Sequence, residues 1–187
     1  MPRALDVLIA AVALALLSPV LLVAALAIKL GSRGPVVYRQ RRVGKDGREF
    51  ELLKLRTMEL GSDPVGVGRV VARDDPRVTA AGRFLRRTSL DEIPNLVNVL
   101  RGEMAIVGPR PTIPAQVAAY TPFQHRRHEV RPGLTGWAQV QGRARIPWEE
   151  RIELDVEYVE RRSLALDLRI LAKTAWLLLT GHGLAPD

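Results

Sequence analysis

The chain of 187 residues contains no cysteine. This absence excludes disulfide bridges, thiolate zinc sites and thiol nucleophiles, and it fits a reducing compartment. Aromatic residues account for only 5% of the chain, which disfavours a nucleic-acid surface built from aromatic side chains interleaved with basic ones. Only three histidines are present, and His125 and His128, which lack a third ligand, are interpreted as part of a surface charge run. Carboxylates and basic side chains remain as candidates for chemistry.

Basic residues are in excess. The net charge is +8 and the sequence pI is about 10.7, so the surface should attract phosphates, nucleic acid or anionic lipid. Charge alone does not choose among these ligands. The length suits one domain with at most an added anchor. We place the anchor at residues 1–30 and the domain at residues 31–187.

The anchor is an apolar run, Val7 to Ile28, whose only non-hydrophobic residues are Ser18 and Pro19. At about 1.5 Å per residue, it is long enough to cross a hydrocarbon layer of roughly 30 Å as one helix. The Ser18-Pro19 pair divides it into two shorter arms, and proline forces a kink or a break. A re-entrant hairpin therefore fits as well as a spanning helix.

A cleaved signal peptide is a third interpretation of this run, since Ala25-Leu26-Ala27 resembles a cleavage site. Seven basic residues against one acidic residue over positions 29–48 argue against export. We therefore expect the body of the protein to stay in the cytosol.

The pattern of the remaining chain predicts an α-rich α/β protein with few short strands. Alternating residues around Lys45-Asp46-Gly47 favour a β-hairpin, and residues 59–76 are typical of a long loop. A short strand is expected at Met104 to Val107, and helices are expected at 78–87, 90–100, 113–128, 147–162 and 164–179. The last helix is amphipathic and suits either the membrane interface or the core.

The strongest local pattern is a pair of carboxylates, Asp91 and Glu92, just after Arg86 and Arg87. At a helix start, free N–H groups and the helix dipole favour the ionised form of a carboxylate. An ionised aspartate can attack phosphorus when basic groups or a metal neutralise the phosphate. Both carboxylates also suit Mg²⁺, which binds one or two carboxylates and keeps several waters.

A structural interpretation of the same residues competes with the catalytic one. Ser89 and Glu92 have the spacing of a capping box, in which both side chains only complete the first turn of a helix. Pro94 would then fall in the second turn, where it lacks the N–H that a regular helix needs. We therefore expect a distorted helix at the carboxylate pair.

Two further basic segments suggest phosphate contacts. Arg110 lies between Pro109 and Pro111, whose fixed φ angles give its guanidinium a stiff support. Lys54 and Arg56 share one face if their segment is extended. Taken singly, each segment also fits an ordinary solvated surface.

In their order along the chain, these pieces resemble the bacterial sugar transferase family, the small monotopic phosphoglycosyl transferases. The resemblance covers nearly the whole chain and rests on Ser18-Pro19 in the apolar run and on residues 54–58, 88–96, 98–104, 107–111, 131–140 and 153–159.

The resemblance implies a double displacement. Asp91 would attack the β-phosphorus of a UDP-sugar, UMP would leave, and polyprenyl phosphate would take the sugar phosphate from the aspartyl intermediate. It also implies Mg²⁺ at Asp91 and Glu92, with the role of Glu92 left open between metal ligand, base and support for Asp91. The implied anchor is a re-entrant helix broken at Ser18-Pro19, which enters one leaflet and returns.

We therefore expect a monotopic inner-membrane enzyme that uses a UDP-sugar, polyprenyl phosphate and membrane lipid, and no nucleic acid. Self-association as a homodimer stays open. The expected substrate-binding residues are Lys54, Arg56, Arg86, Pro109, Arg110, Pro111 and Asp167. The competing interpretations are a membrane-anchored basic module that binds anionic lipid or nucleic acid, and a membrane-tethered phosphohydrolase.

Overall fold

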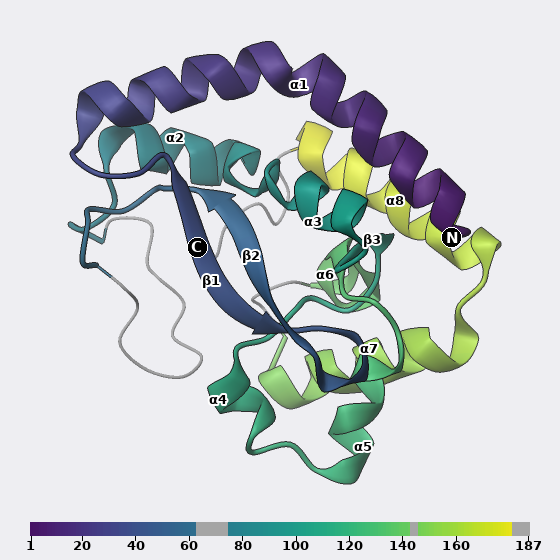
Figure 1. Cartoon of the computed structure of the whole chain (residues 1–187). Coiled ribbons are helices and arrows are strands. Elements are labelled where there is room, and N and C mark those ends of the chain that lie inside the picture. The colour runs from purple at the N-terminus through teal and green to yellow at the C-terminus, as the bar shows by residue number, and fades with distance from the viewer. Residues whose placement is uncertain (63–74, 143–145, 181–187) are drawn as a thin grey trace.

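One long helix, α1 (Arg3–Gly31), arches along one side of the molecule, and α2, α3 and β3 pack against it (Figure 1). The structure is a computed structural model that describes residues 1–62, 75–142 and 146–180. The remaining helices and helical turns are α2 (Ala80–Thr88), η2 (Leu90–Glu92), α3 (Asn95–Arg101), α4 (Pro114–Val117), α5 (Pro122–His125), η3 (Arg126–Glu129), α6 (Trp137–Gln141), α7 (Trp148–Arg161) and α8 (Leu164–Thr180).

The described strands form two small sheets. β1 (Val37–Val43) and β2 (Glu49–Leu55) are antiparallel, joined by the turn η1 (Lys45–Gly47), as the sequence predicts. β3 (Ala105–Val107) and β4 (Gly133–Thr135) are parallel, and β3 confirms the expected strand. The prediction of an α-rich protein with few short strands is therefore confirmed.

Proline changes two of the expected helices. The helix expected over 113–128 is wrong, because Pro122 lacks the N–H needed to continue a helix and instead starts α5 behind a capping box at Thr121. The helix expected over 90–100 is interrupted, and α3 begins only after Pro94. Most of the predicted loop at 59–76 lies outside the described residues.

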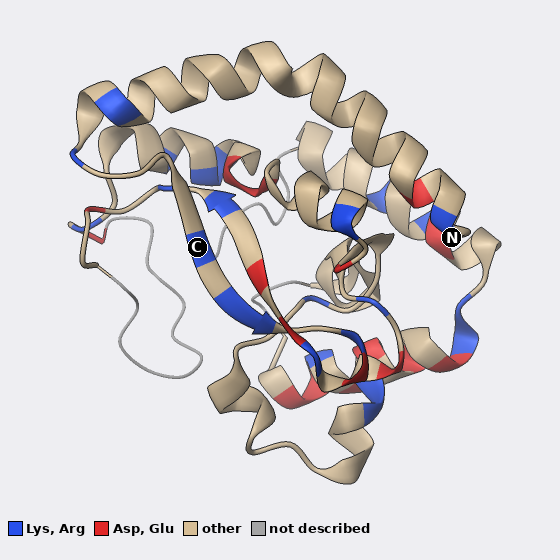
Figure 2. Cartoon of the chain, viewed as in Figure 1, with Lys and Arg blue, Asp and Glu red and all other residues tan. Residues whose placement is uncertain are grey.

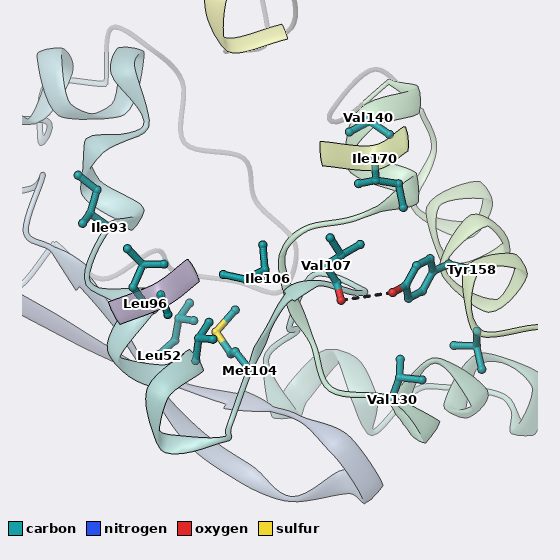
Figure 3. Packing of buried hydrophobic residues seen from close by; sticks show 13 residues of the cluster. Leu52, Ile93, Leu96, Met104, Ile106, Val107, Val130, Val140, Tyr158 and Ile170 are labelled. Carbon is teal, nitrogen blue, oxygen red and sulfur yellow. Dashed lines mark hydrogen bonds between the residues drawn. The ribbon is translucent and has the colours of Figure 1, made fainter. Parts of the chain in front are cut away.

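The hydrophobic core centres on β3 (Figure 3). Its neighbouring residues Ile106 and Val107 face different parts of the cluster, with Leu96 on one side and Tyr158 of α7 on the other. The Tyr158 hydroxyl also donates to the Val107 carbonyl oxygen at 3.3 Å. Because β3 leads directly into residues 108–111, this packing fixes the start of the segment that carries Arg110.

The expected break at Ser18-Pro19 is not confirmed, since α1 is helical across both residues. Pro19 has no N–H for the carbonyl of Ala15, and the Ser18 hydroxyl donates to that carbonyl oxygen at 2.8 Å instead. The serine thus replaces the hydrogen bond that the proline removes, and the helix continues with a curved axis (Figure 1).

The surface of α1 differs from that of a buried core helix. α1 is long and apolar enough to cross a membrane, and only 11% of its most apolar window is buried. Its charged residues lie only near its two ends, Arg3 and Asp6 at one and Lys29 at the other (Figure 2). This exposure of a long apolar surface indicates membrane association.

The N-terminal end of α1 is fixed to the body by polar contacts. The Arg3 guanidinium donates to the carbonyl oxygens of Val99 and Leu100 in the last turn of α3 and to that of Met104, which follows the helix. The buried Asp6 carboxylate accepts a hydrogen bond from the Ile106 N–H at 3.0 Å. A helix C-terminus and a strand N–H therefore hold the first turn of α1.

The other end of α1 is fixed by Arg56, which directly follows β2. Its guanidinium donates to the carbonyl oxygens of Ser32, Arg33 and Pro35 at 3.1, 2.7 and 2.7 Å. Ile28 of α1 packs in one apolar cluster with Leu55. Both ends of α1 thus lie against the same body.

α8 has one packed and one exposed face. It contacts α6, β3 and β4, and Ile170 is fully buried. Leu168, Trp176 and Leu179 are exposed. The helix therefore combines core packing with an apolar outer surface.

Candidate active site

The carboxylate pair lies in the short turn η2, between α2 and α3. Ser89 adopts a left-handed conformation, φ 56°, which ends α2 and redirects the chain before Asp91. Ser89 makes no capping hydrogen bond at the start of η2, and Glu92 turns to basic side chains instead. The capping-box interpretation is therefore wrong, and the expected distortion at the pair is confirmed.

Glu92 is held by two cations. Lys54 Nζ and Arg110 Nη2 each donate to Glu92 Oε1 at 2.7 Å, and Arg110 Nη1 donates to Oε2 at 3.4 Å. Burial alone would raise the pKa of Glu92, but the charges and hydrogen bonds of Arg110 and Lys54 outweigh it and hold the pKa well below its usual range. Glu92 is thus ionised and holds both basic groups in place.

Asp91 has a different environment. Its side chain is 12% exposed, and the Lys54 ammonium lies 3.9 Å from Asp91 Oδ2, beyond hydrogen-bond distance. Burial raises the pKa of Asp91 above its usual range, while the charge of Lys54 acts in the opposite direction. The basic neighbours thus offset only part of the effect of burial on the pKa of Asp91.

A cavity of about 650 Å³ opens beside Asp91. Lys54 and Arg86 line it together with the carboxylate. Arg86 reaches it from the last turn of α2, where its Nε donates to the Thr57 hydroxyl at 3.0 Å. Glycine at position 82 allows this approach, since a Cβ there would lie 2.0 Å from the Thr57 carbonyl oxygen. The cavity thus brings the Asp91 carboxylate together with Lys54 and Arg86, and Arg39, Arg42, Arg56 and Glu59 also line it.

The segment 109–112 is held along its whole backbone. Each of its four carbonyl oxygens accepts a hydrogen bond from another part of the chain. The donors, in order, are Gly133 N–H at 2.9 Å, Arg127 Nη2 at 2.8 Å, Arg42 Nη1 at 2.9 Å and Val43 N–H at 2.8 Å. The stiff support expected for Arg110 thus comes from these contacts as well as from the two prolines.

Arg127 supplies one of these donors from a buried ion pair with Asp155. The side chains of Arg127 and Asp155 are 2% and 4% exposed. Arg127 Nη1 also donates to the Tyr120 hydroxyl at 2.7 Å. The interpretation of residues 125–128 as a surface charge run is therefore wrong for Arg127 and for His128, which is also buried.

Sequence reasoning missed the role of Asp155, although a signal was present. Asp155 lies on the buried face of α7 with Ile152, Val156 and Val159. A carboxylate at helical spacing among core residues requires a buried partner. Its partner, Arg127, lies 28 residues away in the sequence, which hides the pairing.

Two of the expected substrate-binding residues have other contacts. Arg56 lines the edge of the cavity, but its guanidinium is bound to the backbone after α1. Asp167 is buried beside the Met1 amino group and accepts from the Tyr158 hydroxyl at 2.8 Å. Within the described ranges, no hydrogen bond or ion pair links Asp167 to the carboxylate pair, and it does not line the cavity. The structure therefore does not bring Asp167 to the site.

The pair has donors suited to Mg²⁺ but no complete protein cage. Among the described residues, no group of three histidine, cysteine, aspartate or glutamate side chains is placed to hold a metal. Mg²⁺ often binds through one or two carboxylates together with substrate phosphates and waters. Asp91 fits this mode, whereas Glu92 would join only by exchanging Lys54 or Arg110.

Comparison with known proteins shows to which family the chain belongs. The model of the bacterial sugar transferase family matches residues 1–181. The sugar transferase EpsL of Bacillus subtilis is 45% identical over 87% of this chain and 78% of EpsL. The UDP-glucose:undecaprenyl-phosphate glucose-1-phosphate transferase of Caulobacter vibrioides is 47% identical over 95% of this chain and 69% of that enzyme.

The chain belongs to the bacterial sugar transferase family. The corresponding glucose-1-phosphate transferase of Escherichia coli is 44% identical over 93% of this chain, which spans only 39% of that longer enzyme. The similarity to the Escherichia coli enzyme is therefore limited to a part of that enzyme.

Proposed function

We propose that the chain transfers a sugar 1-phosphate from a UDP-sugar to polyprenyl phosphate, with Asp91 as the nucleophile. Membership of the family makes it a phosphoglycosyl transferase. The observation that carries the proposal is the contrast within the pair. Glu92 is neutralised by two cations, whereas Asp91 lines a cavity and accepts no hydrogen bond from a cation among the described residues. Such a contrast separates the roles of two neighbouring carboxylates.

The proposed reaction has two displacements at phosphorus. Asp91 Oδ attacks the β-phosphorus of the UDP-sugar, the bond to the bridging oxygen breaks, and UMP leaves with that electron pair. A phosphate oxygen of the acceptor then attacks the aspartyl phosphosugar, and Asp91 leaves as a free carboxylate. Lys54 and Arg86, which line the cavity, neutralise the phosphoryl oxygens in both steps. Mg²⁺ bound at Asp91 would add further neutralisation of phosphate charge.

Glu92 acts in this proposal as a positioning group. Its lowered pKa makes it a poor base for the acceptor, and both of its oxygens already accept from Arg110 or Lys54. It therefore holds Lys54 beside Asp91 and orients Arg110 toward the pair. Arg110 is the proposed contact for the nucleotide phosphates.

The anchor is proposed to enter and leave the membrane on one side, with the body on the cytosolic side. The contacts at both ends of α1 support this, because a helix that crossed the bilayer would separate Arg3 and Asp6 from α3 and β3. The hydrogen bond from the Ser18 hydroxyl to the Ala15 carbonyl oxygen lowers the free energy needed to bend α1 inside the bilayer.

We expect Met1 and the body to share the cytosolic side, and we expect Ser18→Leu combined with Pro19→Leu to move Met1 to the other side, because a straighter apolar helix favours crossing. Since the chain has no native cysteine, a single cysteine at Ala4 or Ser32 reports the side. In intact cells, a membrane-impermeant maleimide should spare both positions in the native background and label position 4 in the double leucine variant. Labelling of position 4 in the native background would establish a spanning helix.

The reaction itself is tested with a panel of UDP-sugars, Mg²⁺ and undecaprenyl phosphate, with UMP release as the readout. One sugar should support continuous UMP release that depends on the acceptor. Without acceptor, a transferase should stop after at most one turnover. Continuous release of sugar phosphate without acceptor would identify a phosphohydrolase. The basic module would be favoured if no UMP were released and if loss of Asp91 left the binding of lipid or nucleic acid unchanged.

A further inference from the structure

The cavity beside Asp91 combines charged and apolar lining residues. Asp91, Lys54 and Arg86 form the charged end beside the proposed nucleophile, and Arg39, Arg42, Arg56 and Glu59 also line the cavity. Val37 and Leu60 belong to the apolar wall and are 38% and 66% exposed. A cavity with this division of chemistry matches an amphiphile that carries a phosphate at one end.

The apolar wall continues into the anchor. Leu60 Cδ1 lies 3.3 Å from the position of a Cβ at Gly34, in the segment that follows α1. Leu55 lines the cavity and also packs with Ala24 and Ile28 of α1. The cavity thus runs from the carboxylate to the place where the chain leaves the anchor.

Only one carboxylate of the pair, Asp91, belongs to the lining of the cavity. Of the described residues, those that line the cavity include Asp91 but neither Glu92 nor Arg110. Asp91 is therefore reached through the cavity without displacing the Glu92 ion pairs.

We propose that this cavity is the acceptor subsite, in which Val37 and Leu60 bind the first isoprene units of polyprenyl phosphate. This inference rests on the proposed function and adds the place of the lipid substrate. A volume of about 650 Å³ suits a phosphate with a short length of prenyl chain, so the remainder of the chain stays in the lipid beside α1. The charged end then brings the acceptor phosphate to the phosphorus bound to Asp91.

The test uses Leu60→Asn and Val37→Asn in the full chain reconstituted in lipid vesicles. Both side chains are partly exposed, so their replacement leaves the core intact. We expect the KM for undecaprenyl phosphate to rise about tenfold, the usual effect of losing an apolar contact in a pocket. The single turnover of UMP release from the donor alone should stay within twofold of wild type.

Leu30→Asn is the matched control. Leu30 lies near the end of α1 and is 80% exposed, but it does not line the cavity. We expect the control to keep the wild-type KM for the acceptor. An equal rise in the control would assign the effect to general membrane contact and overturn the subsite.

Two other outcomes also overturn the proposal. Slower single-turnover UMP release, or a higher KM for the UDP-sugar alone, would assign Val37 and Leu60 to the donor. Unchanged kinetics for both substrates would show that Val37 and Leu60 do not bind the acceptor. Failure of the proposed function is distinguishable, because wild-type protein would then release either no UMP or UMP continuously, and not a single turnover, in the donor-only experiment.

Discussion

Asp91→Asn is expected to reduce turnover by at least about a thousandfold, the scale on which loss of a covalent nucleophile acts. An amide nitrogen or oxygen is a far poorer nucleophile than a carboxylate. The fold should survive, because asparagine has nearly the same shape and the nearest ammonium, Lys54 Nζ, lies 3.9 Å away. UMP release measures the loss, and a melting temperature close to that of wild type confirms that the variant is folded.

Glu92→Gln is the matched control for this experiment. The variant removes the charge that holds Lys54 and Arg110, so activity should fall. The loss should be smaller than for Asp91→Asn, because the proposed nucleophile remains. Normal turnover by Asp91→Asn, with Glu92→Gln inactive, would transfer the central role to Glu92.

Asp155→Ala is expected to destabilise the protein by about 3–5 kcal/mol, because it leaves the Arg127 guanidinium buried without its counterion. Denaturant unfolding in detergent measures this change. Donor binding should weaken as well, since Arg127 also donates to the Arg110 carbonyl oxygen. The kinetic readout is the KM for the UDP-sugar at a temperature where the variant is folded.

The double variant Arg127→Met with Asp155→Leu separates stability from positioning. It removes both charges, so much of the lost stability should return. The hydrogen bond to the Arg110 carbonyl stays lost, so the KM for the donor should remain high. Recovery of both properties would show that Arg127 only contributes to stability, and an unchanged free energy of unfolding in Asp155→Ala would contradict the buried pair.

Local patterns predicted those parts of the structure that depend on neighbouring residues. The β-hairpin follows from alternation around an Asp46-Gly47 turn, where both residues have positive φ. The distortion near Asp91 was expected from Pro94, and α3 begins only after that residue. These features are local, so they were accessible from the sequence.

The features that sequence reasoning missed depend on distant contacts. Arg56 was expected at the substrate, yet its guanidinium is bound to the backbone more than 20 residues earlier. Arg127 was expected at the surface, and only its pairing with Asp155 explains its burial. Spacing along the chain carries little information on such pairs, because the fold decides which elements meet.

The central claim is that Asp91 carries the sugar phosphate between the two substrates. The most direct test is the intact mass of wild-type protein given its UDP-sugar and Mg²⁺ without acceptor. The mass should increase by one sugar phosphate, peptide mapping should locate the adduct on Asp91, and polyprenyl phosphate should then remove it. An unmodified wild-type protein that still transfers the sugar phosphate to the acceptor would contradict the covalent mechanism.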